Sequence, residues 1–105
     1  MEEYVVTGRP ARAPIHPGEL IGEILEEHFH LPVADAARRM RVSRQSLHAV
    51  LSGQSAVTPG MALRIGKLFN RDPQIWLNMQ VAHDLWKAEQ SMARELDAIK
   101  SAEMA

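Results

Sequence analysis

Residues 33–53 read VADAARRMRVSRQSLHAVLSG, and this stretch decides how the rest of the chain is interpreted. Two groups of apolar residues recur in it at three- and four-residue spacing: Ala36, Ala37 and Met40, then Leu47, Val50 and Leu51. Each group predicts a short amphipathic helix. Between them, the Ser43 hydroxyl can accept a hydrogen bond from a backbone N–H of the second helix, and Gly53 can end that helix.

Two short helices joined by a tight turn, the second beginning with polar and basic residues, are typical of a helix-turn-helix. If the apolar group of the second helix faces inward, Arg44, Gln45 and His48 face outward, with Ser46 at the edge. An arginine fork fits guanine, a glutamine amide fits adenine, and backbone amides at a helix N-terminus suit phosphate. We therefore predict these DNA-binding residues: Ser43, Arg44, Gln45, Ser46, His48, Arg38 and Arg41.

The net charge of the whole chain does not indicate a polyanionic partner, but the charge of its middle third does. The 105 residues have a net charge of −1, but residues 38–71 contain seven basic residues and no acid. Residues 1–37 carry seven acids and two arginines, and residues 72–105 carry six acids and three basic residues. The basic block is a footprint for a polyanion if several charges share one face, and a solvated surface otherwise. Phosphate anchors or solvated charges are expected at Arg38, Arg39, Arg41, Arg64 and Lys67.

Helical patterns also lie on both sides of the central stretch, which predicts an all-α fold. Residues 1–15 are expected to form an extended arm, with a short strand at residues 4–6, and residues 16–105 a single domain. Proline suits the first turn of helices that begin at Pro17 and Pro59, and a last, long helix is expected over residues 73–101. With the two central helices, the domain has five.

Composition removes several classes of function. The chain has no cysteine, which excludes disulfides, thiolate zinc sites and cysteine nucleophiles. Its apolar runs are far shorter than the ~20 residues of a membrane span, and it begins without the pattern of a signal peptide, so we expect a cytoplasmic location. The histidines lack ligand spacing, and no nucleophile, base and orienting group are recognisable. We therefore predict no enzyme activity, no metal and no cofactor.

Three further motifs, in this order along the chain, resemble one family. They are His16-Pro17-Gly18-Glu19, Val57-Thr58-Pro59 with Met61-Ala62-Leu63-Arg64, and Trp76-Leu77-Asn78-Met79-Gln80. Together with the helix-turn-helix they are similar to the HigA-type antitoxins of the Xre or lambda-repressor-like group. The resemblance runs from about residue 16 to residue 85. It departs from the family at Arg41, where such turns usually carry glycine, and at Gly60, where an acid is common.

The resemblance implies a five-helix DNA-binding domain that dimerises, binds a palindromic operator and represses its own operon. Many members of the family also neutralise a HigB-type toxin that cleaves mRNA, so the resemblance implies this function as well. Two alternatives are a stand-alone regulator of the same fold, and a module that sequesters a protein partner without binding DNA. The N-terminal arm could exchange a strand in a dimer, contact a toxin or be disordered.

The long last helix carries an apolar stripe that a small domain cannot cover by itself. Leu85, Ala88, Met92, Leu96 and Ile99 recur at spacings of three and four. A second copy of the chain is the economical partner, because a two-fold dimer presents two recognition helices to successive half-sites. A toxin-docking surface is the alternative. Trp76 and Trp86 are expected to fill core and interface. The predicted dimer-interface residues are Leu85, Met92, Leu96 and Ile99.

Overall fold

The computed structural model describes residues 12–103, and they are helical without a strand. The all-α prediction is confirmed, whereas the strand predicted at residues 4–6 lies outside the described residues. The helices are α1 (Pro17–Glu23), a π-helical turn η1 (Ile24–His28), α2 (Val33–Met40), α3 (Arg44–Leu51), α4 (Pro59–Phe69), α5 (Gln74–Ser91) and α6 (Ala93–Ala98). In this part of the chain no helix has both the length and the apolar character to cross a membrane.

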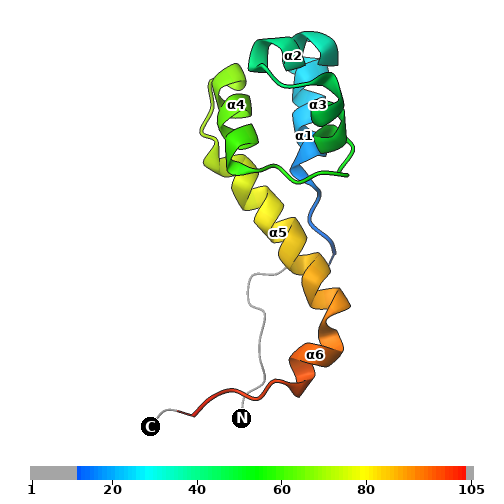
Figure 1. Cartoon of the computed structure of the whole chain (residues 1–105), viewed down its shortest axis with the longest axis vertical. Helices are drawn as coiled ribbons and strands as arrows, with labels where there is room; N and C mark the ends of the chain where they lie inside the picture. The colour runs from blue at the N-terminus through cyan, green and yellow to red at the C-terminus, as the bar shows by residue number, and fades with distance from the viewer. Residues whose placement is uncertain (1–11, 104–105) are drawn as a thin grey trace.

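The first four α-helices form a head, from which α5 extends toward α6, so that the chain measures 55 × 25 × 22 Å (Figure 1). Within the head, α2 lies across one end and contacts both α3 and α4, while α1 contacts α3 and α5 (Figure 1). One core joins these helices, and both predicted apolar groups contribute to it. Its buried members are Ile21, Leu25, Ala36, Ala37, Met40, Leu47, Val50, Val57, Ala62, Ile65, Phe69 and Trp76.

The His-Pro-Gly motif begins α1 and sets how closely that helix approaches α3. His16 Nδ1 accepts a hydrogen bond from Gly18 N–H at 2.9 Å, and Pro17 occupies the first helical position, where no N–H donor is needed. A Cβ atom on Gly18 would lie only 1.9 Å from the carbonyl oxygen of Val50 in α3. Only glycine therefore allows the two backbones to meet at this distance.

Three helical segments end in a left-handed residue that is not glycine. His30, Arg41 and Asn70 have φ values of 48°, 61° and 56°. After α4, Arg71 N–H donates to Gly66 O and Asn70 N–H to Lys67 O, which is the Schellman pattern. Such ends stop a helix sharply and turn the chain back onto the head. The π-helical turn that precedes the first of these ends has no signature in the apolar periodicity of the sequence.

A long helix is present near the C-terminus, as predicted, but the prediction that it runs unbroken over residues 73–101 is wrong in its continuity and in its end. The structure divides it at Met92, whose φ of −107° and ψ of 16° separate α5 from α6, and helical structure stops at Ala98. The Ser91 hydroxyl donates to Ala88 O just before the break, a local bond that competes with the helix. Residues 91–100 are all exposed, so no core packing maintains a continuous helix there.

The contact between Gly18 and Val50 predicts a large effect of one methyl group. Gly18→Ala should lower the free energy of unfolding by about 1–3 kcal/mol, because the added Cβ forces two backbones apart. Gly60→Ala is the matched control: its Cβ would meet nothing within 4 Å, and it should raise stability by up to about 1 kcal/mol. Urea denaturation followed by circular dichroism measures both. A similar effect at the two sites would contradict the close approach.

Candidate nucleic-acid interface

Helix α3 presents a polar face, as the sequence predicts. Leu47 and Val50 are buried against the core, whereas Arg44, Gln45 and His48 are exposed. Ser43 is the N-cap: its Oγ accepts a hydrogen bond from Ser46 N–H at 3.0 Å. The Ser43 hydroxyl in turn donates to Ser46 Oγ at 2.8 Å. These contacts fix the first turn of α3, where backbone N–H groups point out of the helix end.

The turn before α3 has a regular geometry even though it carries arginine in place of glycine. Arg41 is left-handed, its N–H donates to Arg38 O at 3.2 Å, and Val42 N–H donates to Ala37 O at 3.0 Å. Together these form a Schellman motif at the end of α2. Arg41, the departure from the family pattern, therefore adopts the left-handed conformation that glycine adopts at no steric cost.

The basic side chains lie on three elements and the turn between two of them. Arg44 lies on α3, and four others line a cleft of about 460 Å³ where α2 and the turn after it meet α4. Met40, Leu63 and Leu68 supply the apolar walls of this cleft. Arg38 is exposed on α2 and pairs with Asp35 at 2.9 Å. The four cleft cations are Arg39, Arg41, Arg64 and Lys67.

Arg64 has a structural role that the sequence did not predict. Its Nη1 donates to Met40 O, and also to Arg41 O at 3.4 Å. Both acceptors are carbonyls at the C-terminal end of α2, where a positive charge is favourable. Arg64 thereby ties α4 to the turn of the helix-turn-helix. A contact between residues this far apart in sequence has no signal in local spacing.

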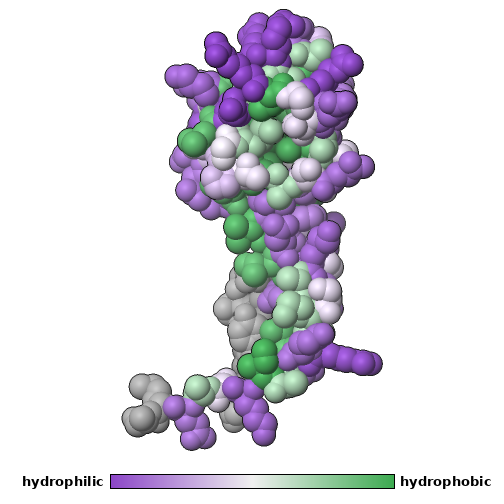
Figure 2. All heavy atoms as spheres, in the orientation of Figure 1, coloured by the Kyte–Doolittle hydropathy of each residue, from purple (hydrophilic) through white to green (hydrophobic). Residues whose placement is uncertain are grey.

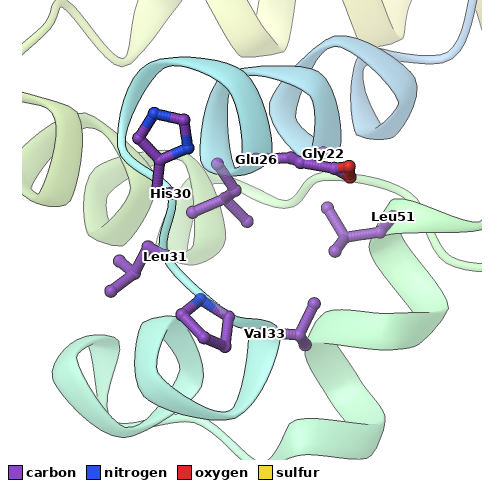
Figure 3. A pocket seen from close by; sticks show the side chains of 8 residues that line it. Gly22, Glu26, His30, Leu31, Val33 and Leu51 are labelled. Atoms are coloured by element: carbon purple, nitrogen blue, oxygen red, sulfur yellow. The ribbon is translucent and has the colours of Figure 1, made fainter.

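A second groove lies between η1, α2 and the end of α3. His30 and Leu31 lie on one side of it, and Val33 and Leu51 on the other (Figure 3). Its only lining side chains with ionisable groups are Glu26 and His30, and the other lining residues are glycine, proline and apolar residues. The groove therefore has no hydroxyl, thiol or amine nucleophile beside these two groups. Within residues 12–103 no three metal-ligating side chains gather either.

The apolar side chains of the last two helices remain exposed. Hydrophobic side chains run down one edge of α5 and recur at α6, whereas hydrophilic ones cover the α2 end of the head (Figure 2). Val81 belongs to this exposed set, with 55% of its surface accessible, although the apolar stripe predicted from the sequence does not include it. Trp76 is buried in the core, as expected. The predicted interface residues Leu85, Met92, Leu96 and Ile99 are exposed as well.

Fold and site together define a helix-turn-helix protein of the lambda-repressor-like class. No protein-family model matches the chain. An HTH-type transcriptional regulator of Haemophilus influenzae is 33% identical over 78 residues, which span 74% of this chain and 73% of that protein. Virulence-associated protein I of Dichelobacter nodosus is 35% identical over 86 residues, 82% of this chain and 80% of that protein.

Solved structures agree with these relatives. The antitoxin GraA is 31% identical and has a TM-score of 0.81, over 88% of this chain and all of that one. Pseudomonas aeruginosa antitoxin HigA, solved with the higBA promoter, is 27% identical with a TM-score of 0.79, over 86% of this chain and 99% of that one. The chain belongs to the family of HTH-type transcriptional regulators that includes the HigA antitoxins.

The left-handed Arg41 predicts a stabilising substitution. Arg41→Gly should raise the free energy of unfolding by about 0.5–1 kcal/mol, because glycine adopts this conformation without the Cβ clash. Asn70→Gly is the matched control: its φ is 56° against 61° at Arg41, but asparagine tolerates this region, so the gain there should be smaller. Urea denaturation compares the two variants. Equal gains would contradict the strain assigned to Arg41.

Proposed function

We propose that this protein is a dimeric, sequence-specific DNA-binding repressor of the antitoxin type, which acts on its own operon. The observation that carries the proposal is the exposed polar face of a capped α3, built from Arg44, Gln45, Ser46 and His48. GraA, solved in complex with its operator, supports it: that structure is 31% identical, with a TM-score of 0.80. Pseudomonas aeruginosa HigA was likewise solved with promoter DNA.

In the proposed complex, α3 lies in the major groove of a palindromic operator. Arg44 and Gln45 stand at the start of the helix, where side chains reach base edges, and they read guanine and adenine. Ser43, Ser46 and His48 contact phosphate or base from the same face. Arg38 and Arg41 contribute positive charge at the end of α2. The place of action is the cytoplasm, where bacterial DNA lies.

The dimer is proposed to form through the exposed apolar stripe of α5 and α6. Leu85 lies in the second half of α5, and Met92, Leu96 and Ile99 lie in or beside α6, which is at the other end of the molecule from α2 (Figure 1), so pairing there would leave the α3 face open. Two-fold symmetry then supplies two copies of α3 for the two halves of a palindrome. The chain is proposed to neutralise a HigB-type toxin as well. The neighbouring reading frame distinguishes the two functions. A frame that encodes a small ribonuclease-like protein supports the antitoxin, and its absence supports a stand-alone regulator.

The base-reading role predicts a loss of selectivity on substitution of Arg44. Arg44→Ala should reduce the preference for the duplex upstream of the protein's own reading frame, over a shuffled duplex, by about 1–3 kcal/mol. Lys67→Ala, in the α2–α4 cleft, removes the same charge and should weaken both duplexes equally. Fluorescence anisotropy at several salt concentrations measures both effects. Equal loss of selectivity in the two variants would contradict the base-reading role of Arg44. An affinity that does not depend on salt concentration would contradict the proposed DNA-binding function.

The dimer predicts that a charge placed on the stripe separates the protomers. Leu96→Asp should convert the protein to monomer at micromolar concentration, because an unpaired carboxylate would be buried in the interface. Glu95→Asp changes the neighbouring residue of α6 without altering charge, and should leave the dimer intact. Sedimentation equilibrium gives the mass of each. A Leu96→Asp protein that stays dimeric would assign the stripe to another partner.

A further inference from the structure

The loop between α3 and α4, residues 52–58, is held by two side chains from outside it. His16 contacts Ser55 O through Nε2 at 3.0 Å, and Gln80 Oε1 accepts a hydrogen bond from Val57 N–H at 2.8 Å. His16 begins the His-Pro-Gly motif, and Gln80 ends the Trp-Leu-Asn-Met-Gln motif. Two motifs far apart in the sequence therefore converge on the loop that directly follows α3.

The contacts of His16 fix the protonation of its ring. Gly18 N–H can only donate, so Nδ1 is the acceptor and carries no proton. Nε2 then carries the proton and donates a hydrogen bond to the carbonyl oxygen of Ser55. The neutral ring thus bridges the start of α1 and the loop after α3. A second proton, on Nδ1, would face the Gly18 N–H at the positive end of α1.

The surroundings of His16 also favour the neutral ring. His83 on α5 contacts it edge-on, with ring centroids 5.3 Å apart, and its own Nδ1–H donates to Pro14 O at 2.8 Å. Burial lowers the pKa of His16 below its ordinary value of 6.5, and the nearby charges of His83 and Lys87 lower it further. The Ser55 hydrogen bond and Asp84 oppose this shift. The first turn of α1 adds Glu19, whereas the loop has no titratable side chain.

We propose that His16 is a positioning residue for DNA binding: its neutral ring holds the loop, and with it the end of α3, in the binding geometry, and protonation releases them. This inference rests on the proposed DNA-binding function. Release follows because a proton on Nδ1 would meet the Gly18 N–H, so the ring has to turn away from α1; this turn also withdraws Nε2–H from Ser55 O, although that hydrogen bond taken alone favours the charged ring. Since the folded state favours neutral His16, the contribution is complete above about pH 6.5 and is lost as pH falls through the lowered pKa.

Operator affinity as a function of pH tests the proposal. The probe is the duplex upstream of the protein's own reading frame, followed by fluorescence anisotropy between about pH 8 and about pH 5. All proteins carry His48→Gln, which removes the histidine of the α3 face from the pH profile; because His48 belongs to the proposed DNA-binding face, affinities are compared only with that of this parent protein. This parent protein should lose affinity about fivefold at the acidic end, the effect of one lost hydrogen bond.

Two substitutions divide the functions of the ring. His16→Asn keeps an acceptor for Gly18 N–H but cannot reach Ser55, so its affinity should be about fivefold weaker at every pH. His16→Gln places a donor near Ser55 without a titratable proton, so it should bind as tightly as the parent at high pH and keep that affinity at low pH. Circular dichroism at each pH verifies that the variants are folded.

Three outcomes are distinguishable. Identical pH profiles for the parent and His16→Asn would overturn the inference while leaving DNA binding intact. Loss of all preference for the upstream duplex by the unsubstituted protein would overturn the proposed function itself. If a His16 variant does not fold, NMR titration of the unsubstituted protein decides: the amides of Ser55, Val57 and the end of α3 should shift with the His16 ring. If the chemical shifts of these amides do not change as the His16 ring titrates, the inference is overturned.

Discussion

The approach of two backbones, at Gly18 in α1 and Val50 in α3, is the constraint on which the head depends. Because α1 touches α3 with no side chain between them, the angle of α3 follows that of α1 directly. His16 supports the contact on both sides, since one ring nitrogen caps α1 and the other holds the loop after α3. The polar face of α3 is thus oriented by a motif that contributes nothing to that face.

Much of this architecture could be predicted from local patterns. Ser43 caps α3 as predicted, because its hydroxyl can accept a hydrogen bond from the first turn of the helix, and Thr58 caps α4 in the same way. The apolar spacing identified Leu47 and Val50 as core residues. The orientation of the α3 side chains followed from that spacing. The DNA-binding and dimer roles of the selected residues stay predictions, since exposure permits a contact without specifying its partner.

The sequence could not predict what depends on contacts between distant segments. Arg64 was expected among phosphate anchors or solvated charges, yet its guanidinium caps the end of α2. The basic block of residues 38–71 is continuous in sequence, but only the fold brings four of its cations, from α2, the turn after it and α4, together in one cleft. The break at Met92 was missed because the apolar periodicity continues through it, while the packing that would stabilise a continuous helix is absent there.

The length of α5 has a geometric consequence for any dimer held through the far end of the molecule. An 18-residue helix is a rigid arm of about 27 Å. A rotation of roughly 10° at its far end would displace the head by about 5 Å, more than the ~3.4 Å rise of one base pair. The spacing of half-sites that such a dimer accepts is therefore governed by the angle at which the two arms cross, and small changes in their side chains can retune it without altering α3.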